Sequence, residues 1–245
     1  MSFAARAGRP SCATSFTTST IMLQLIGLGV LQLTVGLGPW GWTAGAVHLV
    51  VVAALLVRAA RRADLPGFGA ANAVTLLRSL LGGQVLALAI ALLVGDSEAL
   101  VVLVGIAVVA ILLDGVDGLV ARRTNNCSDF GARFDMEADA FLIMVLSAYA
   151  AFTIGWWAVS IGLMRYGFVL AARCAPWLTR PLPVRMDRKV VAVMQMVGLV
   201  VAVSDVLPAP YAQALLLLCL AALCWSFGRD VVWLWRRRGQ APTAA

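Results

Sequence analysis

The sequence predicts an all-α membrane protein, a polytopic bundle of transmembrane helices. Of its 245 residues, 62% are hydrophobic and only 13% are charged, whereas soluble domains carry about 25% charged residues. The hydrophobic residues gather in separate runs, and each run must be helical to cross lipid, because lipid offers no partner to an unpaired peptide group. No segment is both long and polar enough to form a second, soluble core.

Eight apolar runs predict eight helices, since a spanning helix needs about 20 largely apolar residues. They cover residues 21–39, 42–57, 73–95, 99–121, 136–154, 157–175, 190–205 and 210–234. The first run is long and no small-residue cleavage site follows it, so we expect a retained helix rather than a cleaved signal peptide.

The connection after the second run divides the chain into an N-terminal unit and a larger remainder. Its sequence, rich in Gly, Ala and charge, suits a cytoplasmic linker or a short helix on the membrane surface. The expected parts are an N-terminal tail with a two-helix unit (1–57), the linker (58–72), a six-helix membrane domain (73–235) and a C-terminal tail (236–245).

Basic residues predict the orientation of the bundle. The chain has 19 Lys and Arg against 12 Asp and Glu. The tails and every second connection carry arginines, while the alternate connections GPWG, GDSE, GWW and SDVLPAP have no Lys or Arg. Cytoplasmic loops are the basic ones, so both termini and the stretch 114–139 are expected in the cytoplasm. Nucleic acid is an unsuitable partner, because no polar domain exists to carry it; anionic membrane lipids account for the charge.

The stretch DGVDGLVARRTNNCSDFGARFDMEAD contains two spaced pairs of aspartates. Asp114 and Asp117 lie three residues apart at the end of the fourth helix, and Asp135 and Asp139 lie four apart at the start of the fifth. Each spacing puts two carboxylates on one helix face, and residues 123–134 allow the chain to fold back. Four facing carboxylates repel one another unless they take up protons or hold a cation. Hard oxygen ligands suit Mg²⁺ or Mn²⁺, in one or two ions.

Neighbouring residues add a possible phosphate site to these acids. Arg122 lies one turn beyond Gly118 and can pair with a phosphate through two hydrogen bonds. Gly118 and Gly131 leave room for a ligand to approach the backbone. The alternative for any single aspartate is an ordinary charge at a helix end, which is what we expect of Asp129 and Glu137, since both lie off the shared faces.

Taken together, D-GV-D-G-LV-AR, eight residues and G-ARF-D-MEA-D resemble the signature of the CDP-alcohol phosphatidyltransferase family. All its fixed positions are present: Asp114, Asp117, Gly118, Ala121, Arg122, Gly131, Asp135 and Asp139. A weaker similarity is Asn-x-x-Thr-x-x-Arg at the first core helix, here Asn72, Thr75 and Arg78. The fifth core helix keeps Lys189 and Gln195 but lacks the second lysine and the threonine of the family pattern.

This resemblance implies a six-helix catalytic core, formed here by the third to eighth helices, with the two N-terminal helices as an addition. It implies a CDP-linked lipid donor, usually CDP-diacylglycerol, a small alcohol acceptor, release of CMP, and a possible homodimer. The four aspartates would hold two Mg²⁺ or Mn²⁺ ions, and Asp139 would be the general base. The residues implied at the nucleotide and diphosphate are Asn72, Thr75, Gly118, Ala121, Arg122 and Gly131.

A phosphorylated acceptor needs cations beyond Arg122. The candidate acceptor contacts are Arg133, Arg165, Arg188 and Lys189. Arg165 falls inside an apolar helix, where a charge needs a partner, and pairing with a core carboxylate explains it equally well. These cationic residues favour glycerol 3-phosphate or inositol phosphate as the acceptor, and leave serine and choline as open alternatives.

Three other classes of protein share some of these features. A transporter or channel that uses intramembrane carboxylates explains the helices but not the Gly and Ala-Arg positions. A membrane prenyltransferase also binds metal-diphosphate through aspartates, but with different spacings. A catalytically silent bundle would not need all eight signature positions.

Overall fold

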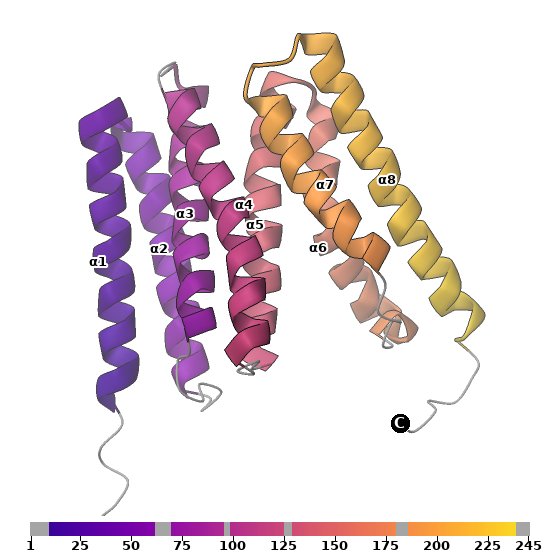
Figure 1. Cartoon of the computed structure of the whole chain (residues 1–245), viewed down its shortest axis with the longest axis horizontal. Helices are drawn as coiled ribbons and strands as arrows, with labels where there is room; N and C mark the ends of the chain where they lie inside the picture. Colours follow the sequence, from indigo (N-terminus) through magenta and orange to yellow (C-terminus); the bar gives the residue numbers. More distant parts are fainter. Residues whose placement is uncertain (1–9, 62–69, 96–98, 125–128, 180–185, 239–245) are drawn as a thin grey trace, which may run out of the picture. The chain divides into compact units, whose positions relative to one another are not determined.

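The computed structural model describes residues 10–61, 70–95, 99–124, 129–179 and 186–238. The regular secondary structure of this part of the chain is all helical (Figure 1), as the sequence predicts. It contains eight α-helices and two short 3₁₀ helices: α1 (Pro10–Val35), α2 (Gly38–Arg61), α3 (Ala70–Leu93), α4 (Ala99–Thr124), α5 (Asp129–Thr153), η1 (Trp156–Ala158), α6 (Val159–Cys174), η2 (Pro176–Thr179), α7 (Met186–Val203) and α8 (Ala209–Arg236).

Five segments within the described residues are long and apolar enough to cross a membrane. They are Thr17–Val35, Gly38–Arg58, Ala73–Leu93, Arg133–Thr153 and Ala209–Arg236. The apolar part of α4, Ala99–Gly115, is shorter. With 16 residues, α6 rises about 24 Å, which is less than the roughly 30 Å of a hydrocarbon core. The chain is thus an integral membrane protein, although not all eight helices are full-length spans.

The first two helices differ from their expected bounds. α1 begins at Pro10 rather than at residue 21, because proline suits the first position of a helix and Ser and Thr do not prevent its continuation. The sequence GPWG opens α2 instead of connecting the helices. The turn lies at Gly36 and Leu37, where Gly36 and Gly38 have φ of 71° and 61°, a backbone conformation that glycine adopts without strain.

Two connections, the one between α2 and α3 and the one between α4 and α5, are also shorter than expected. α2 ends at Arg61 and α3 begins at Ala70, so both ends of the predicted linker 58–72 are helical, and residues 62–69 lie outside the described residues. α5 begins at Asp129 rather than at 136. Asp135 and Asp139 therefore lie within regular helix, where their relative directions are fixed by the helical repeat.

The chain divides into two compact units, Met1–Leu142 and Ile143–Ala245. In the first unit α3 is the central helix, in contact with α1, α2 and α4 (Figure 1). Its buried residues include Leu80, Val85 and Leu88. A helix that is apolar on all sides suits this central place, and its few polar residues are consequently held inside the unit.

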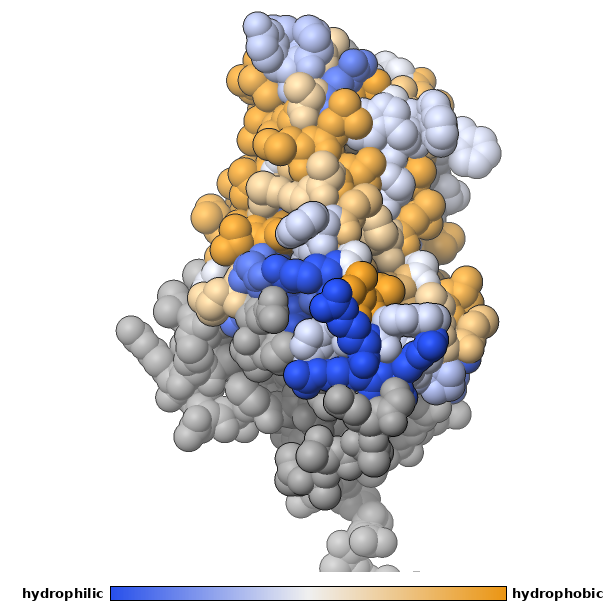
Figure 2. Space-filling model, turned by 90° about the vertical axis from the view of Figure 1, so that its right-hand side faces the viewer, coloured by the Kyte–Doolittle hydropathy of each residue, from blue (hydrophilic) through white to orange (hydrophobic). Residues whose placement is uncertain are grey.

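The second unit contains the end of α5 and the helices that follow it. Here α7 packs closely on α8: Gln195 Nε2 donates to the carbonyl of Cys219 at 2.6 Å, and a Cβ on Gly198 would come within 2.5 Å of Cys219 Sγ. One face of the molecule is mostly apolar, with strongly hydrophilic side chains gathered toward one end (Figure 2). Such an apolar surface is what a helix bundle presents to lipid.

Gly162 is expected to be the position where α6 tolerates no side chain against α5. A Cβ there would lie 2.3 Å from Ser147 Oγ and 2.8 Å from Met144 Cα, while a Cβ on Gly167 meets nothing within 4 Å. Because backbone cannot move aside, Gly162→Ala should cost about 1–3 kcal/mol of stability. Gly167→Ala, on the same helix, should be neutral or slightly stabilising. Thermal unfolding in detergent measures both, and equal melting temperatures would contradict this packing.

Candidate active site

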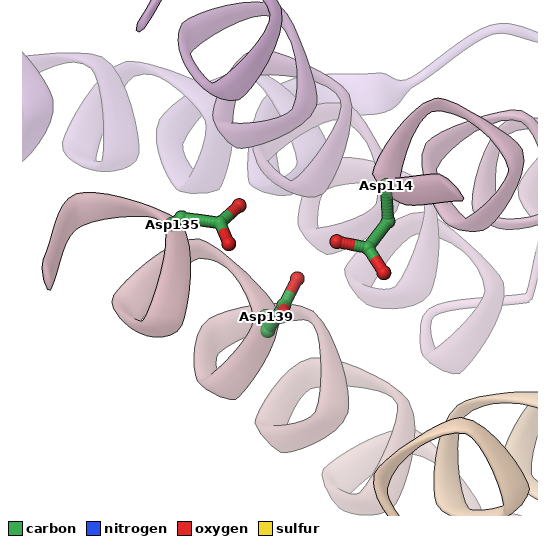
Figure 3. A group of neighbouring side chains, drawn as sticks. All are labelled: Asp114, Asp135 and Asp139. Carbon is green, nitrogen blue, oxygen red and sulfur yellow. The ribbon is translucent and has the colours of Figure 1, made fainter. Parts of the chain in front are cut away.

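Three aspartates of the signature converge within the first unit. Asp114 comes from α4, and Asp135 and Asp139 come from α5 (Figure 3). One carboxylate oxygen from each lies within 4.8 Å of the others. Their side chains are 34%, 33% and 28% exposed, so the cluster is accessible from outside. The expectation that Asp135 and Asp139 share a helix face is confirmed.

A buried arginine on α3 contacts all three carboxylates. Arg78, 5% exposed, places Nη1 at 2.9 Å from Asp114 Oδ1 and at 2.5 Å from Asp135 Oδ1, and its Nη2 donates to Asp139 Oδ1. Charge-assisted bonds of this kind are about twice as strong as neutral ones. The guanidinium offsets part of the repulsion among the acids and connects α3, α4 and α5 at this point.

Arg78 is not among the site residues that the sequence predicts. In the sequence it is only the third fixed residue of Asn-x-x-Thr-x-x-Arg. A signal was nevertheless present, because an arginine inside an apolar helix requires a partner, and α3 has no acidic residue of its own. The aspartate pairs on α4 and α5 are the acids within helices that could serve as this partner.

The predicted nucleotide contacts are only partly described. Thr75 is buried in α3, one turn before Arg78, and Gly131 is half-buried in the first turn of α5. The backbone of α4 continues through the rest of the signature to Thr124. The side chains of Asn72, Asp117, Gly118, Ala121 and Arg122 lie outside the described residues. Their roles stay predictions.

The predicted acceptor contacts fall in both units. Arg133 is exposed on α5, two residues before Asp135. Arg165 is half-buried in α6, and Lys189 is exposed on α7. Arg188 Nε of α7 lies 3.3 Å from Asp230 Oδ2 of α8. A second ion pair between these two helices joins Arg229 Nη1 and Asp187 Oδ2 at 2.5 Å. Arg188 therefore already has an anionic partner, which weakens its case as an acceptor contact.

Comparison with known families decides the class of this site. The family model described as CDP-alcohol phosphatidyltransferase matches residues 68–225. The chain belongs to the CDP-alcohol phosphatidyltransferase family. The match covers α3 to α7 and the first part of α8, and leaves α1 and α2 outside. No curated protein and no solved structure matches the chain.

Membership makes the chain a membrane enzyme of phospholipid synthesis, a transferase for substituted phosphate groups. The donor class is a CDP-linked lipid, the acceptor class is an alcohol, and the family depends on a divalent metal. The three clustered carboxylates are compatible with such a metal, because Mg²⁺ and Mn²⁺ prefer hard oxygen ligands. These properties agree with the predictions made from the signature.

Proposed function

We propose that the chain transfers a phosphatidyl group from CDP-diacylglycerol to the hydroxyl of a small polar alcohol and releases CMP. The observation that carries this proposal is the convergence of Asp114, Asp135 and Asp139, all fixed positions of the family signature, in one accessible cluster. A transporter would also use intramembrane carboxylates, but it gives no reason for the match over residues 68–225.

In the proposed reaction Asp139 is the general base. Its carboxylate takes the proton of the acceptor hydroxyl as the new bond forms between that oxygen and the lipid-side phosphorus. The bond between this phosphorus and the bridging oxygen of CMP breaks, and the electron pair leaves with CMP. Arg122 offsets the charge that develops on the leaving phosphate. Asn72, Thr75, Gly118, Ala121 and Gly131 contact the nucleotide and the diphosphate.

The donor atoms of the cluster fit the divalent metal of the family. We assign Asp114, Asp117, Asp135 and Asp139 as its ligands; three of these already present oxygens within 4.8 Å of one another. When bound, Mg²⁺ or Mn²⁺ neutralises the diphosphate and stabilises charge on the leaving oxygen. Arg78 contributes positive charge among the same oxygens.

A phosphorylated acceptor, glycerol 3-phosphate or inositol phosphate, fits the basic residues best. Arg133 is the best supported of the four candidates, because it is exposed on the same helix as Asp135 and Asp139. Arg165, Arg188 and Lys189 belong to the second unit and stay sequence-based predictions, with the case for Arg188 weakened by its Asp230 partner. The distribution of arginines among the connections supports a cytoplasmic location for this site and for both termini.

An acceptor panel tests the proposed reaction. Purified protein is incubated with CDP-diacylglycerol, Mg²⁺ or Mn²⁺, and in turn glycerol 3-phosphate, inositol phosphate, serine and choline, and CMP release is measured. We expect release that depends on the acceptor and is largest with a phosphorylated one, because the candidate contacts are cationic. Chelation of the metal should abolish it, since the carboxylates would then lack the cation that binds the diphosphate.

Reactions without acceptor, and reactions with CDP in place of the lipid donor, control for hydrolysis. CMP release that is the same with and without every acceptor would refute phosphatidyl transfer. Greater release with serine or choline would leave the reaction in place and refute the assignment of the acceptor.

A further inference from the structure

The two N-terminal helices lie outside the family match, yet they contact the helices that carry the site. His48 of α2 is 6% exposed, and its ring stacks on Phe141 of α5, with centroids 4.8 Å apart and planes at 29°. Phe141 is two residues beyond Asp139. Phe141 also meets α3, where a Cβ on Gly82 would lie 3.2 Å from the ring.

A second contact between α2 and α5 lies on the N-terminal side of the aspartate pair. Val52 and Leu56 form a buried cluster with Leu76 of α3, and Phe134 packs against this cluster. His48, Val52 and Leu56 follow one another at four-residue intervals, which places them in one stripe along α2. Phe134 and Phe141 are seven residues apart, two helical turns, and so they lie on one face of α5 and bracket Asp135 and Asp139.

The position of the His48 ring is itself closely determined. A Cβ on Gly83 would lie 2.2 Å from His48 Nδ1 and 2.9 Å from Gln24 Nε2 of α1, so the ring fits only because α3 has glycine there. Nδ1 of His48 and both amide atoms of Gln24 are buried without a hydrogen-bond partner among the described residues. Such burial costs about 1–3 kcal/mol per group, so a contact made for stability alone would use apolar residues.

We propose that the N-terminal helix pair is a positioning element for phosphatidyl transfer, and that His48 is its main positioning residue. The stripe on α2 holds Phe134 and Phe141, and thereby fixes the rotation of α5 that aims Asp135 and Asp139 at Asp114. His48 touches neither donor nor acceptor in this role. The inference rests on the proposed function, because it assumes that the carboxylate cluster binds the metal and performs the transfer.

The test measures Mn²⁺ affinity and turnover in four full-length variants. The Mn²⁺ dissociation constant comes from the EPR signal of free Mn²⁺, and kcat and KM come from CMP release. His48→Ala removes the stack, His48→Phe keeps it, and Gly83→Ala displaces the ring. Gly105→Ala is the matched control, since a Cβ there meets nothing within 4 Å.

We expect His48→Ala and Gly83→Ala to weaken Mn²⁺ binding about tenfold, the lower end of the effect of residues that orient metal ligands. kcat should fall similarly, with KM for the donor little changed. His48→Phe should restore both values and Gly105→Ala should keep them. If His48→Ala fails to fold, His48→Leu, which fills the space without a ring stack, takes its place with the same expectation.

Two results would overturn the proposal. One is a destabilised His48→Ala variant with wild-type Mn²⁺ affinity, which would show a purely structural role. The other is wild-type protein that binds no Mn²⁺. If the wild type binds Mn²⁺ but forms no CMP with any acceptor, the proposed function fails, while the Mn²⁺ measurements still decide between positioning and structure.

Discussion

Asp139→Asn is expected to lower acceptor-dependent CMP release by at least about 100-fold, and up to about 10,000-fold, the range that a general base contributes. Asparagine has the shape of aspartate but cannot take the acceptor's proton. Its Oδ1 can still accept a hydrogen bond from Arg78, as the Asp139 carboxylate does, so the arrangement of α3 and α5 is kept. Binding of CDP-diacylglycerol should change little, because Asp114, Asp117 and Asp135 remain.

Glu137→Gln is the matched control for this substitution. It also removes one negative charge from α5, but Glu137 is exposed and is not among the three clustered carboxylates. Its turnover should stay within a few-fold of the wild type. Turnover in Asp139→Asn equal to that of Glu137→Gln would refute the assignment of Asp139 as the base, whatever reaction the enzyme performs.

The predictions that succeeded from sequence are those that depend on local spacing. Eight apolar runs became eight α-helices, because hydrophobicity over about 20 residues determines which segments can enter lipid. The four-residue interval between Asp135 and Asp139 placed both carboxylates toward Asp114, because the helical repeat fixes that direction. The start of α1 was wrong, because Ser and Thr residues carry no hydrophobic signal but are compatible with helix.

What the sequence did not predict are contacts between distant segments. Arg78 and Asp139 are 61 residues apart, and no periodicity within α3 indicates which helix it will face. The contact of His48 with Phe141 is likewise a property of packing, since each residue alone is ordinary in an apolar helix. The glycines at positions 82 and 83 are visible in the sequence, but only the packed structure shows how closely they approach the rings of Phe141 and His48.

Arg78→Gln is expected to destabilise the metal-free protein and to increase the stabilisation that metal provides. Arg78 contacts the same three carboxylates that are the candidate metal ligands, so without it these acids repel one another. Removing one partner from a buried ion pair costs on the order of 3 kcal/mol, and less here because the carboxylates are about a third exposed. A guanidinium and a divalent cation compete for the same oxygens. Saturating metal should therefore raise the stability of the variant more than that of the wild type.

Thermal unfolding with chelator and with saturating Mg²⁺ measures both effects. In chelator the melting temperature of Arg78→Gln should fall by several degrees, and the rise on adding Mg²⁺ should exceed that of the wild type. Arg78→Lys should lie between them, because lysine keeps the charge but lacks the forked geometry that reaches three carboxylates. Arg133→Gln, an exposed arginine of α5, is the control and should leave both values unchanged. A metal-free melting temperature in Arg78→Gln equal to that of Arg133→Gln would show that the guanidinium does not stabilise the cluster. Solvent screening alone would then offset the repulsion among the carboxylates.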